Sequence, residues 1–374
     1  MKNHGYRSLL GDTKQLAVER ALAELRSGRA VLLRGSGESL VVTAFENLDA
    51  DGLALIGRIG GAPRLVLSAA RLRWLKAGMT DAGVILVDGV DLETLADLVA
   101  GENDVLRKAA QPAGDTEKAA LELVRLSLLL PAAVIFDAQA MDAAAVDTLV
   151  CVDASAVMGF QKAASSGLKI VSRAPVPLEG VETCEFVVFR GGDGLREQIA
   201  VLIGKPLDRK PVPLRIHSAC LTGDLFGSLK CDCGDQLRGT VRRMAAEGGG
   251  IILYLDQEGR GNGIANKIRA YCLQHRGYDT YDADELLGFE NDHRNFDIAA
   301  SMLRQLGVHE VQLMTNNPHK IKALEDAGLH VAATQRVITR TNGHNVGYLA
   351  AKRDRAGHLF DKDHIMEFKA ANEG

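Results

Sequence analysis

The stretch that decides how this chain is organised is Cys220-Leu-Thr-Gly-Asp-Leu-Phe-Gly-Ser-Leu-Lys-Cys231-Asp-Cys233. Its cysteines follow a C-x10-C-x-C spacing, and the whole chain contains six cysteines. Thiolates are soft ligands that favour zinc. Structural zinc sites normally use four protein ligands, whereas catalytic sites use three and leave the fourth position to water. Because no fourth cysteine stands at a similar spacing, we expect Cys220, Cys231 and Cys233 to hold a catalytic zinc ion.

Polar residues flank the cysteine stretch on both sides. Arg215, His217 and Ser218 precede it, and Gln257-Glu-Gly-Arg-Gly261 follows the next predicted buried strand, where ligand sites of α/β sheets gather. In that run Gly259 allows close backbone approach, and Arg260 offers a planar fork for phosphate oxygens. The pattern therefore indicates a phosphorylated substrate. The alternative interpretation of the cysteines is a closed structural zinc site completed by another ligand such as His217.

Length and composition restrict the class of protein. The 374 residues suggest two domains, and the 47% apolar content is ample for their cores. Six cysteines, three of them within one short stretch, are not the paired framework of a secreted protein, so we expect a reducing, cytoplasmic location. No apolar run is long enough to span a bilayer, which predicts no membrane association. A net charge of −4 argues against nucleic-acid binding.

The second half of the chain is predicted to be mixed α/β. A linker is indicated by Ala174-Pro-Val-Pro-Leu-Glu-Gly180, which gives domains over residues 1–173 and 178–374. Strands are expected at residues 185–190, 198–203, 214–217, 250–255 and 311–314, the first two joined through the glycine-rich residues 191–194. Helices are expected at residues 236–246, 266–274, 297–306 and 319–327.

The first half shows a similar alternation without a chemical constellation. Thr13 is placed to cap a helix that ends near Gly28, and further helices are expected at residues 92–100 and 116–129. Strands are expected at residues 30–33, 39–45, 83–88 and 134–137. Taken together, the two halves predict an α/β (mixed α+β) fold in two domains.

From Arg215 to Lys320 the sequence resembles GTP cyclohydrolase II, with weaker similarity back to Leu178 and forward through Gly357. The matching blocks, in the family's order, are Arg215-Ile-His-Ser, Cys220-Leu-Thr-Gly-Asp, Cys231-Asp-Cys-Gly-Asp-Gln, Gln257-Glu-Gly-Arg-Gly, Asn266-Lys-Ile-Arg-Ala-Tyr, Leu287-Gly-Phe, Asp292-His-Arg294 and Thr315-Asn-Asn-Pro-His-Lys320. The resemblance implies a cytoplasmic homodimer that opens the guanine imidazole ring of GTP. The expected products are 2,5-diamino-6-(5-phosphoribosylamino)pyrimidin-4-one, formate and pyrophosphate, at the first step of riboflavin biosynthesis.

The resemblance also implies roles for individual residues. Water on the zinc ion would attack C8 of the guanine, Asp292 would accept a proton, and Arg294 would attack the α-phosphate. Tyr271 would hydrogen-bond the base or relay a proton. Mg²⁺ would accompany the triphosphate. The alternative interpretation of Asp292 and Arg294 is an ordinary surface ion pair, and that of Tyr271 is a buried core tyrosine. The expected substrate contacts are Arg215, His217, Ser218, Gln236, Glu258, Gly259, Arg260, Thr280, Thr315 and Lys320.

Weaker motifs in the first half resemble 3,4-dihydroxy-2-butanone 4-phosphate synthase. That family's acidic metal-binding loop is replaced by Arg34-Gly-Ser-Gly-Glu-Ser-Leu40, and its histidine by Asp115, so we interpret the domain as catalytically degenerate. Within the cyclohydrolase blocks the sequence departs from the family at Ala219, Asp256, Asp282 and Asp284. Two alternative functions therefore stay open: a zinc hydrolase that acts on another nucleotide in pyrimidine breakdown, and a non-catalytic nucleotide-binding regulator.

Overall fold

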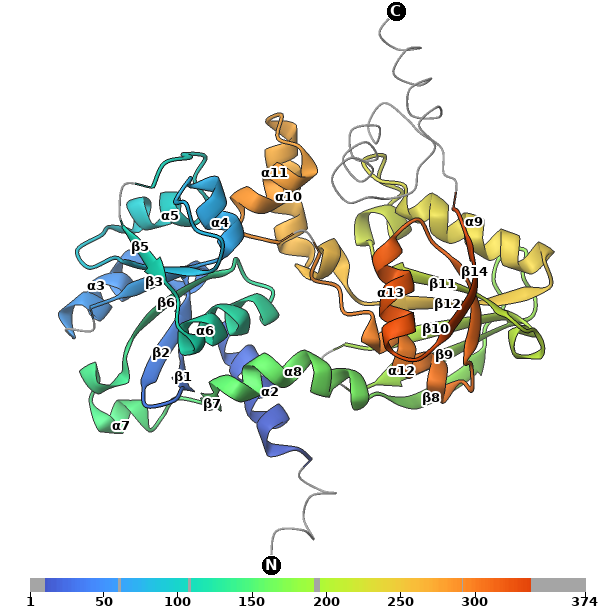
Figure 1. The fold of residues 1–374 in the computed structure, drawn as a ribbon, viewed down its shortest axis with the longest axis horizontal. Helices are drawn as coiled ribbons and strands as arrows, with labels where there is room; N and C mark the ends of the chain where they lie inside the picture. The colour runs from blue at the N-terminus through green and yellow to red at the C-terminus, as the bar shows by residue number, and fades with distance from the viewer. Residues whose placement is uncertain (1–10, 60–61, 107–108, 192–195, 291, 338–374) are drawn as a thin grey trace, which may run out of the picture. The chain divides into compact units, whose positions relative to one another are not determined.

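A computed structural model describes residues 11–59, 62–106, 109–191, 196–290 and 292–337. Within it the chain forms two compact units, each built around a mixed seven-stranded sheet (Figure 1). Unit 1 comprises Met1–Gln161, Ala265–Tyr278 and Asp282–Asp292, and unit 2 comprises Lys162–Ile264, Asp279–Tyr281 and His293–Gly374. This architecture confirms the prediction of a mixed α/β fold with two domains.

The sheet of unit 1 has the strand order β5-β4-β3-β6-β2-β1-β7. All its neighbouring strands are antiparallel except β1 and β7, which run parallel. The strands are β1 (Val31–Arg34), β2 (Ser39–Ala44), β3 (Arg64–Leu67), β4 (Gly83–Leu86), β5 (Ala110–Pro112), β6 (Ala132–Asp137) and β7 (Cys151–Asp153).

Helices cover both faces of this sheet, because alternate side chains of each strand point to opposite sides. One apolar core joins the sheet to α2 (Thr13–Arg26), α6 (Asp115–Leu126) and the first part of α8 (Ala154–Ser166). The other core joins it to α3 (Ala50–Arg58), α4 (Ala69–Trp74), α5 (Leu92–Ala100), α10 (Ile264–His275) and α11 (Thr280–Leu286). The short helix α7 (Ala143–Val146) precedes β7.

The sheet of unit 2 has the strand order β14-β13-β11-β12-β10-β9-β8. Strands β11 and β12, β11 and β13, and β13 and β14 pair in parallel, and the remaining pairs are antiparallel. The strands are β8 (Lys169–Pro175), β9 (Cys184–Arg190), β10 (Gln198–Gly204), β11 (Val212–Ser218), β12 (Gly249–Leu255), β13 (Glu310–Met314) and β14 (His330–Gln335).

Three helices bury apolar side chains against this sheet (Figure 1). Helix α9 (Cys233–Ala246) packs Met244 and Leu237 against Ile252 of β12, whereas α12 (Asp297–Gln305) and α13 (Pro318–Asp326) pack against Ile251 and Leu253 of the same strand. Because adjacent positions of β12 serve two different cores, the sheet is the middle layer of unit 2.

The predicted helices and strands are present, with ends that shift by a few residues. Thr13 does not cap the first helix, because Asp12 is the N-cap and its carboxylate accepts from the amides of Lys14 and Gln15. Helices α3, α4, α7, α8 and α11 and strands β3, β5, β7, β8 and β14 were not predicted. Several are short, and short elements carry little periodic signal.

The predicted linker is only partly irregular. Ala174 and Pro175 pair with Phe186 and Glu185 as the last residues of β8, an edge strand, where proline is tolerated. The compact units divide instead at Gln161, inside α8. The domain bounds 1–173 and 178–374 therefore stay a prediction. Most of the predicted turn at residues 191–194 and the similarity near Gly357 lie outside the described residues.

None of the helices that the structure describes is long and apolar enough to cross a membrane.

Candidate metal and substrate site

The parallel strands of unit 2 end at one edge of the sheet. Strand β11 ends at Ser218, β12 at Leu255 and β13 at Met314. Because parallel strands share a direction, the segments that follow them emerge together, which is where α/β folds bind ligands. Those segments are the cysteine loop, the Gln257–Gly261 turn and residues 315–320, so most of the predicted site residues gather there.

The three cysteines form a cluster. The Sγ atoms of Cys220, Cys231 and Cys233 lie within 4.8 Å of one another, and those of Cys220 and Cys231 are 3.6 Å apart. Two sulfurs bound to one tetrahedral zinc ion at about 2.3 Å would be roughly 3.8 Å apart, so the cluster fits zinc. Hydrogen bonding to Cys220 raises the pKa of the Cys231 thiol, an effect that a bound metal cation would reverse.

His217 does not belong to this ligand group. Its Nε2 lies 3.0 Å from Oδ2 of Asp224, and burial lowers its pKa, so the imidazole is neutral at pH 7 and donates to the carboxylate. The alternative interpretation, in which His217 closes a structural zinc site, therefore has no support from the geometry.

Asp224 is a site residue that the sequence reasoning missed. Besides the contact with His217, its carboxylate accepts from the amide of Cys220 at 3.0 Å and from the hydroxyl of Tyr254 at 3.0 Å. Burial and the Asp224 charge raise the pKa of the Tyr254 phenol, which stays a donor. Asp224 thus fixes the backbone of Cys220, a candidate metal ligand. It stands in the quoted Cys220-Leu-Thr-Gly-Asp block, but its role depends on contacts that spacing alone does not reveal.

Cationic side chains lie beside the cluster. Nη1 of Arg215 donates to the carbonyl of Met314 at 2.9 Å, and Nη2 donates to Gln236. Nζ of Lys320 donates to the carbonyl of Ile216 at 2.7 Å. Burial lowers the pKa of Arg215 to about 10, and the positive charge of Arg294 acts in the same direction. Arg215 therefore stays protonated at pH 7, and together with Arg294 it forms a positive environment suited to phosphate.

Several buried polar atoms at this edge have no hydrogen-bond partner among the described residues. They are Nε of Arg215, Oγ of Ser218, Oε1 of Gln257 and Nδ2 of Asn317. Buried polar atoms in native proteins are normally partnered, so a group of such atoms indicates a place where a polar ligand binds. Gln257 and Asn317 were not among the predicted substrate contacts, although both stand inside sequence blocks that resemble the family.

The Gln257–Gly261 turn has an unusual backbone. Gly259 and Arg260 both adopt the left-handed conformation at φ 60°, which costs energy at the non-glycine position. A carboxylate oxygen of Glu258 accepts from the amide of Leu221 in the cysteine loop. The carbonyl of Arg260 accepts from the amide of His293 at 3.2 Å, so the turn also holds the residue next to Arg294.

The remaining predicted residues are distributed over both units. Thr280 and Thr315 are buried in unit 2. Tyr271, on α10, and the exposed Asp292 belong to unit 1. The Tyr271 ring is half-buried, and Nζ of Lys267 lies 5.7 Å from its centroid.

The sequence is similar to those of known proteins. The sequence model of GTP cyclohydrolase II matches residues 169–337. The GTP cyclohydrolase-2 of Xylella fastidiosa (strain Temecula1 / ATCC 700964) is 41% identical over 97% of this chain and 92% of its own length. The chain belongs to the GTP cyclohydrolase II family. It is therefore a hydrolase of that family, and the similarity to the Xylella protein includes the first half of the chain.

Two further proteins are similar over different parts. The riboflavin biosynthesis protein RibBA of Bacillus subtilis is 49% identical over 44% of this chain and 42% of its own length. A solved two-domain 3,4-dihydroxy-2-butanone 4-phosphate synthase from A. baumannii covers 86% of this chain and 99% of its own, at 18% identity and a TM-score of 0.32. A likeness of this degree does not define a shared fold.

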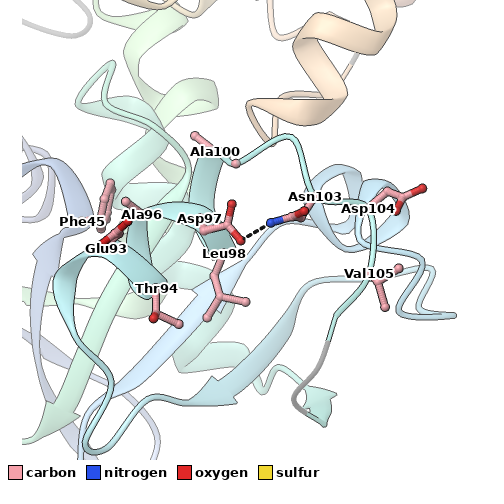
Figure 2. Close-up of a pocket in the computed structure, with 11 residues that line it drawn as sticks. Phe45, Glu93, Thr94, Ala96, Asp97, Leu98, Ala100, Asn103, Asp104 and Val105 are labelled. Atoms are coloured by element: carbon pink, nitrogen blue, oxygen red, sulfur yellow. Dashed lines mark hydrogen bonds between the residues drawn. The ribbon is translucent and has the colours of Figure 1, made fainter.

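Unit 1 of this cyclohydrolase family member contains a separate cavity of about 940 Å³. Figure 2 shows Glu93, Asp97 and Asp104 among its lining residues, with Nδ2 of Asn103 donating to Asp97. The negative charges of these carboxylates would repel a bound triphosphate. The cavity is therefore not a candidate for the nucleotide site of a GTP cyclohydrolase, and the basic edge of unit 2 is.

Gly223 makes the cysteine cluster possible, because a Cβ there would lie 2.8 Å from Sγ of Cys231 and 3.0 Å from Sγ of Cys220. Two ligand atoms would have to move, so we expect Gly223→Ala to weaken zinc binding by about 10- to 100-fold, in the range of second-shell changes. Competition with a chromophoric chelator measures this affinity. Gly239→Ala is the control, since a Cβ on that α9 residue meets nothing within 4 Å. Equal zinc affinity in both variants would contradict the prediction.

Proposed function

We propose that the protein is a zinc-dependent GTP cyclohydrolase II that converts GTP into 2,5-diamino-6-(5-phosphoribosylamino)pyrimidin-4-one, formate and pyrophosphate, the first step of riboflavin biosynthesis. One observation carries this proposal: a three-cysteine cluster lies at the same sheet edge as the buried cations Arg215 and Lys320. A metal ligand set and an anion-binding group in one place suit hydrolysis of a nucleotide. Membership of the cyclohydrolase family supports the same reaction.

Zinc would be held by Cys220, Cys231 and Cys233, whose donor chemistry and spacing fit it. When bound, it supplies a Lewis acid and a water that ionises near pH 7. The protein contributes the orientation of the ligands. Asp224 holds the amide of Cys220, and Glu258 holds the amide of Leu221, so the cysteine loop is fixed from two sides before the substrate arrives.

The triphosphate would lie against Arg215, Arg294 and Lys320, with Mg²⁺ to neutralise the pyrophosphate leaving group. Arg215 supports this placement because its guanidinium is buried and its Nε has no partner among the described residues. The strained turn at Gly259 and Arg260 brings backbone close to the same edge. Ser218 and Gln257 offer further unpartnered polar atoms, which suit the base or the ribose.

The catalytic roles follow from the family resemblance. Asp292 would accept a proton, Arg294 would attack the α-phosphate, and Tyr271 would act on the base. The remaining contacts would come from His217, Gln236, Thr280 and Thr315. His217 would act through Asp224 and not as a zinc ligand, which agrees with its hydrogen bond at 3.0 Å. A cytoplasmic homodimer completes the proposal; the six cysteines form no disulfide with one another, which is compatible with a reducing compartment.

The deciding experiment incubates the purified full-length protein with GTP and Mg²⁺ and measures formate and pyrophosphate, before and after zinc is removed with a chelator. We expect both products in equal amounts, loss of both without zinc, and recovery when zinc is restored. Pyrimidine nucleotides serve as the comparison substrates. If the zinc-loaded protein released no formate from GTP, or if it acted on a pyrimidine nucleotide instead, the proposal would be wrong.

A further inference from the structure

Part of the cyclohydrolase region is built into the other half of the molecule. The family match covers residues 169–337, yet Ala265–Tyr278 and Asp282–Asp292 within it belong to unit 1. These two segments contain nearly all of α10 and most of α11. The first half of the chain, whose sequence we interpret as catalytically degenerate, thus packs directly against a stretch of the cyclohydrolase sequence.

The packing is that of a protein core. Ala270 and Leu273 of α10 and Leu286 of α11 lie in one apolar cluster with Leu65 of β3 and Ile85 of β4. All five side chains are buried. Residues Asn266, Ala270 and Leu273 are the buried positions of α10 and repeat at helical spacing, so the helix docks by one face. By that periodicity Lys267 and Tyr271 point away from the docked face.

Arg71 of α4 is the polar centre of this docking. Its side chain is 0% exposed, and its guanidinium donates to four carbonyl oxygens. Three of these carbonyl groups stand at the end of α5 and accept at 2.8 Å (Leu98), 2.7 Å (Asp97) and 2.9 Å (Gly101). The fourth, that of Leu286, stands at the end of α11 and accepts at 2.9 Å. The carboxyl ends of two helices attract a cation. Burial lowers the pKa of Arg71 only to about 10, so the charge persists at neutral pH.

Further polar contacts hold the two ends of the segment. Oγ of Ser68 donates to the carbonyl of Gly288 at 2.6 Å, just after α11. On α10, Nδ2 of Asn266 donates to the carbonyl of Leu128 at 3.0 Å, and Arg269 forms an ion pair with Glu46. Each of these contacts joins the first half of the chain to the cyclohydrolase segment, so the conformation of that segment depends on unit 1.

We propose that the first half of the chain serves as a scaffold that positions Ala265–Tyr278 and Asp282–Asp292 for the cyclohydrolase reaction, with Arg71 as the central positioning residue. The segment carries Tyr271 and ends at Asp292, so the catalytic consequence rests on the proposed function. In this arrangement the first half orders the segment: it docks one face of α10 and leaves Tyr271 on another.

The test compares Arg71→Met with Arg64→Met in the full-length, zinc-loaded protein. Arg64 pairs with Glu117 at 2.6 Å and so serves as a matched control whose partner lies within the first half of the chain. We expect Arg71→Met to speed amide hydrogen exchange across residues 265–290 by about 10- to 100-fold, because hydrogen bonds to a charged group are lost. The value of kcat/KM for GTP should fall by about the same factor, with zinc content unchanged. Arg64→Met should change neither the amide exchange of the segment nor kcat/KM for GTP.

A milder variant covers the case in which Arg71→Met does not fold. Glu46→Gln keeps an acceptor for the Leu130 amide but removes the charge that pairs with Arg269, so about threefold faster exchange in α10 is expected. Exchange and kcat/KM that match the Arg64→Met control in every variant that folds would overturn the proposal. If the wild-type protein has no cyclohydrolase activity, the proposed function fails, and the exchange measurement still decides whether unit 1 orders the segment.

Discussion

Replacing Cys231 by serine should remove zinc from the protein and lower formate release from GTP by about 10³-fold or more. A serine hydroxyl is a hard, protonated group at neutral pH and cannot replace a thiolate as a zinc ligand. Metal-ion catalysis contributes several kcal/mol, and about 1.4 kcal/mol corresponds to a factor of ten in rate. The loss should therefore be a loss of kcat. Zinc content by atomic emission and formate release under saturating GTP measure the two effects.

The matched control is Cys184→Ala, which removes a buried thiol from β9 of the same unit and leaves the cluster intact. That variant should keep its zinc and its activity and lose only a little stability. A Cys231→Ser protein that retained zinc and full activity would show that the cluster is not the reaction centre. Retained zinc with lost activity would instead point to a metal site closed by another ligand.

The parts of the site that the sequence predicted are those carried by local spacing. Cys220, Cys231 and Cys233 stand close together in the chain, and a loop of that length brings their sulfurs within reach of one ion. Strand β12 is a nearly continuous apolar run, as buried parallel strands are, so the position of the Gln257–Gly261 turn at its end could be expected.

The parts that the sequence did not predict depend on contacts between distant residues. The sequence alone does not distinguish Asp224 from the other acidic residues, because its contacts with Tyr254 and His217 form only in the folded chain. Arg71 looks like an ordinary basic residue of an amphipathic helix, and only the tertiary structure buries it against Leu286. Periodicity located α10 correctly but could not say which unit its apolar face would join, because a hydrophobic stripe does not identify its partner.

Replacing Arg294 should have the second large effect. We expect Arg294→Ala to lower kcat by about 10²- to 10³-fold, the usual cost of removing a group that stabilises charge in the transition state. Arg294 acts electrostatically on Arg215, and its guanidinium lies 5.2 Å from the centroid of the Phe296 ring, so the side chain is held near the cationic edge of unit 2. Formate and pyrophosphate should fall in parallel, because ring opening and phosphate cleavage belong to one reaction in the proposal.

The variant Arg294→Lys distinguishes two origins of that effect. Lysine keeps the charge but loses the planar fork and the nitrogen atoms of the guanidinium. If Arg294 only binds phosphate, lysine should recover most of the activity and the defect should lie in KM. If the guanidinium takes part in the chemistry, lysine should be nearly as inactive as alanine, with the defect in kcat. We expect the second result. Arg304→Lys is the control. That exposed arginine of α12 donates to the carbonyl of Ala327 at the end of α13. An Arg294→Ala enzyme with unchanged kcat would remove Arg294 from the mechanism.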